Sequence, residues 1–206
     1  MKETMNELLS TLNEFGKTFA LLLEDVKTCY GFLQKEDNQF WRRVYIRSAF
    51  ALFEGFIFRM KQIACDVHKI RGDVFTDAEI AFLSEEFTEA VLNDKGEVNT
   101  LKKKRFIAIE GNLKFAFKAY SRAFKSNYTL NLGDDGWEAF KYALQVRHRL
   151  THPKNSAQLL VSDEDLLKVE KGFEWFRKET KTIIESGKFE NIVNDILRRY
   201  GQEPKT

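Results

Sequence analysis

Proline is almost absent from this chain. Of the 206 residues, only Pro153 and Pro204 are proline, and both lie late in the sequence. Proline removes a backbone N–H group and clashes with the preceding helical turn, so the first three quarters of the chain can form long, uninterrupted helices. We therefore expect an all-α fold. The hydrophobic content of 43% is sufficient for a real core, and the length predicts a single domain over residues 1–206.

Charge and cysteine content exclude several classes of protein. The 33 Lys and Arg residues nearly balance the 31 Asp and Glu residues, so any binding to nucleic acid must come from local patches. Cys29 and Cys65 are too few for a disulfide framework or a zinc knuckle. The start of the chain resembles no signal peptide, and no apolar run is long enough to span a membrane. We expect a cytoplasmic protein that does not bind membranes.

Apolar residues recur three or four apart through most of the chain, and polar capping residues separate the segments. Thr76 with Glu79, and Ser162 with Asp165, form the capping-box pattern. A short hairpin is expected at Asp94–Gly96. The predicted helices run from about Lys2 to Leu33, from Asp37 or Asn38 to Ile70, from Thr76 to Leu92, from Lys104 to Lys125, from Asp134 or Asp135 to His152, from Ser162 onwards, and from Lys188 to Tyr200.

The fifth predicted helix carries a cation on its apolar face. At about 100° per residue, Arg147 falls near the middle of the arc formed by the apolar residues between Trp137 and Leu150. A guanidinium there needs a carboxylate, an anionic ligand or a water-filled groove. A structural ion pair, or an arginine that extends its head group into water, remains an alternative to a functional site.

His152 lies at the end of the same helix, where Pro153 frees it from strict helical geometry. Imidazole titrates near neutral pH and can transfer protons, whereas arginine can hold a phosphate by two hydrogen bonds and stabilise a pentacoordinate transition state. Together, Arg147 and His152 meet the chemical needs of phosphodiester cleavage.

The stretch "RHRLTH", from Arg147 to His152, resembles the R-x4-H motif of HEPN domains (higher eukaryotes and prokaryotes nucleotide-binding). This superfamily of helical bundles includes many metal-independent endoribonucleases. The resemblance implies a HEPN-like up-and-down bundle with additional helices and no cofactor. It also implies that Arg147 contacts the scissile phosphate, that His152 acts as acid or base, and that His148 supports or positions the substrate. The family commonly has Asn or Asp where this chain has His148.

The same resemblance implies a homodimer that cleaves RNA, as a toxin or antiviral defence effector, with an antitoxin or another regulatory protein as a further partner. Some HEPN toxins carry a tyrosine two residues after the histidine, which the antitoxin modifies with a nucleotide. This chain has Lys154 at that position.

Glu54 interrupts the apolar run "AFALFEGFIF", which predicts a buried carboxylate in need of a cation. Arg147 is the first candidate partner, and Arg47 and Arg59 are local alternatives. If the pair is buried, Glu54→Ala is expected to lower both the melting temperature and the activity.

Basic residues near the motif and in the densest cationic run are candidates for contacts with RNA phosphates. Such a run is also common at a solvated helix start. The candidate RNA-binding residues are Lys102, Lys103, Lys104, Arg105, Arg149 and Lys154.

Two other interpretations use the same residues. His148 and His152 have the spacing of two zinc ligands on a helix, but Arg149 stands where an HExxH motif needs glutamate, and the flanking cations would repel a metal ion, so no metal site is expected. The second alternative is a catalytically silent HEPN-like helical dimer that binds RNA, a nucleotide or a protein partner as an accessory module.

Overall fold

The structure is a computed structural model, which describes residues 2–92, 98–103 and 107–187, with the two strands described by their backbone alone. The elements, in chain order, are α1 (Lys2–Lys35), α2 (Gln39–Arg71), α3 (Asp77–Ser84), β1 (Phe87–Leu92), β2 (Val98–Lys103), α4 (Ile109–Ala123), α5 (Asp135–Thr151), the 3-10 helix η1 (Ser156–Leu159) and α6 (Asp163–Ser186). The expected all-α class is confirmed, with one two-stranded hairpin added among the described residues.

Local capping chemistry sets most helix starts, as predicted. The Asn38 side chain accepts a hydrogen bond from the Trp41 N–H at 3.0 Å, and the Asp134 side chain caps α5 in the same way. Both predicted capping boxes are present, at Thr76 and at Ser162. These caps satisfy N–H groups that have no partner within the helix.

The segment between α3 and α4 differs from the prediction. The helix expected up to Leu92 ends at Ser84, and Glu85 adopts a left-handed conformation (φ 57°) that turns the chain into β1. The strands pair in antiparallel register from Phe87 opposite Lys103 to Leu92 opposite Val98. Non-local pairing therefore overrides helical periodicity here. The expected turn at Asp94–Gly96 and the helix expected over Lys188–Tyr200 lie outside the described residues.

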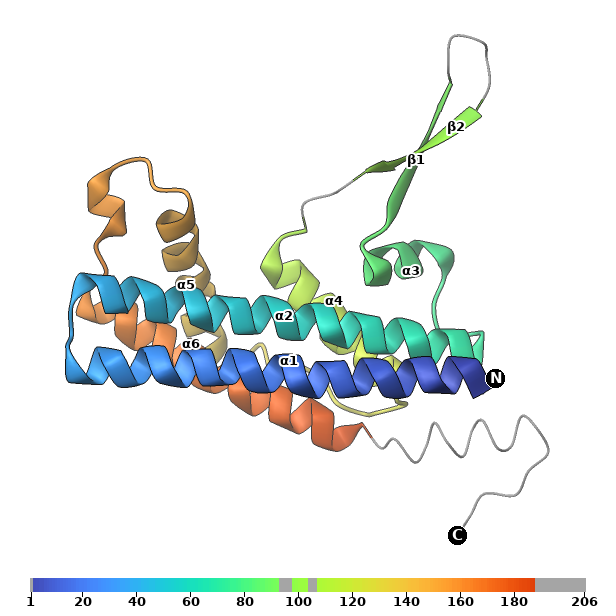
Figure 1. Cartoon of the computed structure of the whole chain (residues 1–206), viewed down its shortest axis with the longest axis horizontal. Coiled ribbons are helices and arrows are strands. Elements are labelled where there is room, and N and C mark those ends of the chain that lie inside the picture. Colours follow the sequence, from blue (N-terminus) through green and yellow to red (C-terminus); the bar gives the residue numbers. More distant parts are fainter. Residues whose placement is uncertain (1, 93–97, 104–106, 188–206) are drawn as a thin grey trace.

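Helix α2 is the centre of the packing. It lies alongside α1 over most of its length and also contacts α4, α5 and α6 (Figure 1). Aromatic rings fill the interior, with the Phe53 and Phe176 ring centroids 4.3 Å apart and those of Phe53 and Phe140 5.3 Å apart. These contacts join α2 to both α5 and α6, so the core fixes where α5 lies.

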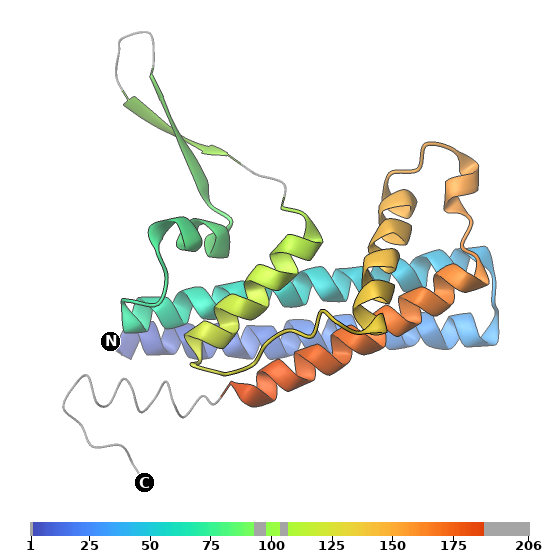
Figure 2. The same cartoon turned by 180° about the vertical axis from the view of Figure 1, so that it is seen from behind.

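Helices α5 and α6 pack unusually closely. A Cβ atom added at Gly172 of α6 would lie 2.9 Å from the Cα atom of Phe140 in α5. Only glycine allows this approach without a shift of the backbone. From this contact α5 projects away from the layer formed by α1, α2 and α6, on the same side as the β1–β2 hairpin, as the opposite view also shows (Figure 2).

Candidate active site

The site predicted from the sequence lies at the end of α5 that projects from the bundle. The helix ends at Thr151, and His152 is its C-cap, with a backbone N–H that donates to the His148 carbonyl at 3.0 Å. This agrees with the expected end at His152, because Pro153 cannot continue the helix.

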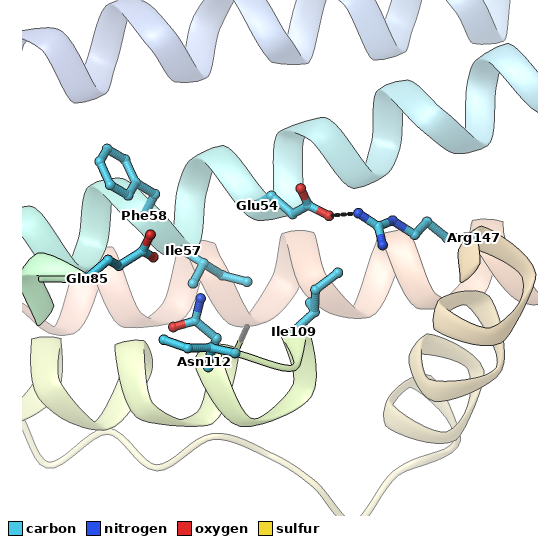
Figure 3. A pocket seen from close by; sticks show the side chains of 8 residues that line it. Glu54, Ile57, Phe58, Glu85, Ile109, Asn112 and Arg147 are labelled. Carbon is cyan, nitrogen blue, oxygen red and sulfur yellow. Dashed lines mark hydrogen bonds and ion pairs between the residues drawn. The ribbon is translucent and has the colours of Figure 1, made fainter. Parts of the chain in front are cut away.

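Arg147 points from α5 towards α2, where its Nη2 lies 2.5 Å from Oε1 of Glu54 (Figure 3). The predicted pairing of these two residues is confirmed. The alternative partners of Glu54 are engaged elsewhere: Arg47 donates to the Leu150 carbonyl at 3.1 Å, and Arg59 donates to Gln62 at 2.8 Å.

The predicted burial of Glu54 is wrong. Its side chain is 44% exposed, and that of Arg147 is 24% exposed. Ala51, Glu54 and Phe58 are exposed positions three or four residues apart on α2, whereas Leu52, Phe53, Phe56 and Ile57 between them are buried. Among the described residues, the glutamate thus occupies an exposed stripe of α2 that is only partly covered, by Arg147 of α5, even though the surrounding sequence is apolar.

The two histidine rings lie close to each other. The ring centroids of His148 and His152 are 5.3 Å apart, and both residues are exposed. Within the described part of the chain, no hydrogen bond or ring contact joins His152 to Arg147. The chain therefore carries Arg147 and His152 on the same helix end without a described hydrogen bond between them.

The Arg149 side chain binds other groups of the protein. Its Nη1 donates to the carbonyls of Gln158 at 2.8 Å and Leu160 at 2.5 Å, and its Nη2 pairs with Asp165 at the start of α6. These contacts hold the segment after Pro153 against α6. They give Arg149 a structural role that the sequence analysis did not include.

The remaining basic candidates do not lie on one helix. Lys102 and Lys103 lie in β2, whereas a basic run of this kind is also common at a helix start. Lys104 and Arg105 lie outside the described residues. Lys154 is exposed beyond α5, and its backbone N–H donates to Gln158 Oε1 at 2.8 Å.

A cavity of about 340 Å³ adjoins the Arg147–Glu54 pair. It lies between α2, α4 and α5, as Figure 3 shows. Its apolar lining consists of Ile57, Phe58, Ile107 and Ile109, and its polar lining of Glu54, Glu85, Asn112 and Arg147. This volume is in the range of small-ligand sites.

Glu85 and Asn112 were not among the predicted site residues. Glu85 is held by Lys61, which is fully buried in α2 and also donates to the Phe82 carbonyl at 3.4 Å. A lysine within the apolar stripe of α2 was the available signal, because a buried ammonium needs a carboxylate. No sequence pattern marks Asn112, since its place in the cavity depends on how α4 packs.

Among the described residues, no group of three or more His, Cys, Asp or Glu side chains is arranged to hold a metal ion. None of the helices in the described ranges is long and apolar enough to span a bilayer. Comparisons of the chain with protein-family models, with curated proteins and with solved structures give no match.

Proposed function

We propose that the chain is a metal-independent endoribonuclease of the HEPN type, with Arg147 and His152 as its catalytic residues. The observation that carries this proposal is the position of Arg147, which lies at the edge of a cavity and on the same helix end as two exposed imidazoles. Its contact with Glu54 is made through Nη2, which leaves other N–H groups of the guanidinium to hold a phosphate.

The proposed reaction uses the substrate's own nucleophile. The 2′-hydroxyl oxygen attacks the adjacent phosphorus and loses its proton, the bond from phosphorus to the 5′-oxygen breaks, and that oxygen gains a proton. The products are a 2′,3′-cyclic phosphate and a 5′-hydroxyl. His152 transfers a proton at one of these oxygens, and Arg147 stabilises the charge that develops on the phosphate. Glu54 orients the guanidinium, and His148 supports His152.

The test is cleavage of a single-stranded RNA by the purified protein in EDTA, with analysis of the product ends. We expect cyclic phosphate ends, no cleavage of DNA of the same sequence, and loss of cleavage in His152→Ala. Cleavage of the DNA, or activity that appears only with added Mg²⁺ or Mn²⁺, would contradict the proposal. For the role as a toxin or defence effector, we expect the wild type, but not His152→Ala, to arrest bacterial growth and degrade total RNA.

A catalytically silent dimer that binds RNA, a nucleotide or a protein partner is the second candidate. The absence of a described contact between His152 and Arg147 within the chain favours it. This alternative would be supported if the wild type binds RNA without cleaving it and if His152→Ala binds RNA with the same affinity.

A further inference from the structure

We propose that a second cavity, among α1, α2 and α6, binds a primary alkylammonium group. The group belongs either to a free alkylamine or to a lysine side chain of another protein. This cavity has a volume of about 510 Å³ and shares no lining residue with the cavity beside Arg147. The inference therefore goes beyond the proposed ribonuclease and does not depend on it.

Tyr45 of α2 carries a polar group that the fold leaves without a partner. The residue lines the cavity and is only 3% exposed, and its hydroxyl makes no hydrogen bond within the described part of the chain. Unlike Asn112 Oδ1, this hydroxyl is not sealed from solvent, so a ligand in the cavity can reach it. Buried polar groups in native proteins are generally hydrogen-bonded, and the unpaired hydroxyl therefore points to a ligand.

Glu170 of α6 adds a carboxylate that no cation neutralises. It is partly buried at the same cavity, and no ion pair or hydrogen bond to it is present among the described residues. Burial raises the pKa of its carboxyl group, because it disfavours the charged form. A bound cation would offset this cost.

Two cations of the protein also line this cavity without neutralising Glu170. Arg177 pairs instead with Glu174, with its Nη2 2.7 Å from Oε2 of that carboxylate. Lys27 is exposed and forms no described ion pair. Neither side chain lowers the pKa of Glu170.

The two carboxylates of α6 also act on a pair of phenols. Burial raises the pKa of Tyr30 and of Tyr45, and the charges of Glu170 and Glu174 raise both further. The two tyrosine ring centroids are 5.3 Å apart. This end of the cavity is therefore electronegative and aromatic, and such an environment attracts a cation.

The positions of the acceptors favour a primary ammonium group over other organic cations. Its three N–H donors point in different directions, so it can bind the Glu170 carboxylate and the Tyr45 oxygen, which come from different helices. A guanidinium is a planar fork that suits two oxygens of one carboxylate, and a quaternary ammonium ion has no N–H donor. Leu23, Val26 and Phe173 form an apolar part of the lining, against which an alkyl chain can pack.

The test is calorimetry of the full chain with cadaverine, a diamine with an alkyl chain, and with pentanol as a neutral ligand of similar length. We expect saturable binding of cadaverine and none of pentanol. Glu170→Gln is expected to weaken the binding of cadaverine by at least roughly tenfold, because a hydrogen bond between charged groups is lost. Tyr45→Phe removes a neutral acceptor and is expected to weaken it by roughly two- to tenfold.

Two measurements separate these losses from indirect effects. The melting temperatures of Glu170→Gln and Tyr45→Phe are expected to equal or exceed that of the wild type, because each substitution removes a group that has no partner. Glu164→Gln is the matched control, since it removes the same charge from an exposed position of α6 outside the cavity lining. It is expected to bind cadaverine with wild-type affinity.

The α-acetyl, methylamide derivative of lysine separates the two sources of the ammonium group, because it presents the side chain on a peptide backbone. Tighter binding of this derivative than of cadaverine assigns the site to a lysine of another protein, and the reverse order assigns it to a free amine. The site would be overturned if neither amine binds saturably, if pentanol binds as tightly as cadaverine, or if Glu170→Gln leaves the affinity unchanged. His152→Ala is expected to bind cadaverine as the wild type does, so the outcome is independent of whether RNA is cleaved.

Discussion

Arg147 and Glu54 form an ion pair at the edge of a cavity rather than inside the core. This position lowers the free energy that the pair is expected to contribute to folding. A buried pair that loses one partner costs roughly 3–5 kcal/mol, whereas exposed pairs contribute about 0–1 kcal/mol. With Glu54 44% exposed, water can screen the charge that a substitution would leave behind. We therefore expect the pair to contribute little to the free energy of unfolding.

Glu54→Ala is expected to reduce RNA cleavage but to change the free energy of unfolding by no more than about 1 kcal/mol. Glu54→Gln keeps one hydrogen-bond acceptor for Arg147 and is expected to retain more activity. Thermal unfolding and cleavage rates measured on both variants check this. A large loss of stability in Glu54→Ala would show that the pair is buried in solution.

His152→Ala is expected to lower the cleavage rate by about 10²- to 10⁴-fold, the usual contribution of a general acid or base. Because His152 is exposed at the end of α5, the melting temperature is expected to remain at the wild-type value. His148→Ala is the matched control, since His148 is also exposed on the same helix end but is proposed only to support His152. Equal losses in both variants would contradict the separate roles.

Helix α5 carries Arg147 and its C-cap His152, and the position of this helix depends on its close contact with α6. Gly172→Ala would put a Cβ atom 2.9 Å from the Phe140 Cα atom and force the helices apart. We expect a loss of about 1–3 kcal/mol, or roughly 2–4 °C in melting temperature per kcal/mol, together with reduced cleavage. Gly16→Ala is the control, because nothing lies within 4 Å of a Cβ atom there and it is expected to stabilise α1 slightly. Matching melting curves for the two variants would show that the helices are not packed this closely.

The start of α6 gives stability a dependence on pH. Burial acts to raise the pKa of Asp165, but the hydrogen bond from the Ser162 N–H and the contact with Arg149 outweigh it and lower this pKa. Because the pKa of Asp165 is lower in the folded than in the unfolded state, the ionised carboxylate stabilises the fold at pH values above its unfolded-state pKa of about 3.9. This stabilisation is lost as the pH falls through the folded-state pKa.

Asp165→Asn is therefore expected to be less stable than the wild type at neutral pH, and the difference is expected to shrink in acid. Melting temperatures between about pH 3 and pH 6 provide the check. Asp163→Asn is the control, because the Asp163 carboxylate is 92% exposed and its contact with Arg42 is expected to contribute little. A constant difference between Asp165→Asn and the wild type across this range would contradict the assignment.

Helix boundaries followed from the sequence where capping is local, as at Asn38, Thr76, Asp134 and Ser162. The β1–β2 hairpin did not, because each strand is stabilised by a partner that a local pattern cannot reveal. The same distinction applies to the site. A carboxylate that interrupts an apolar run and a guanidinium on the apolar face of a helix indicated their pairing, whereas the exposure of Glu54 depends on how the helices pack around α2.

At the scale of the whole molecule, α5 and the β1–β2 hairpin project from the same side of the bundle (Figures 1 and 2). Within the chain, Arg147 points towards α2 and has no described contact with His152. Two α5 ends that meet across a two-fold axis would bring the histidine of one protomer to the arginine of the other. We therefore expect a homodimer with composite sites.

Mixed dimers test this arrangement. Arg147→Lys loses the bidentate fork and His152→Ala loses the proton-transfer group, so each homodimer is expected to be inactive. The two variants are co-expressed with different affinity tags and purified as the mixed dimer. One of its two sites then has both a wild-type arginine and a wild-type histidine. Because two-fold symmetry gives two sites per dimer, roughly half of the wild-type rate is expected. A mixed dimer as inactive as its parents would show that both residues of each site come from one protomer. If light scattering shows a monomer at micromolar concentration and the same sample cleaves RNA, the dimer is excluded, because an active monomer must contain the complete site.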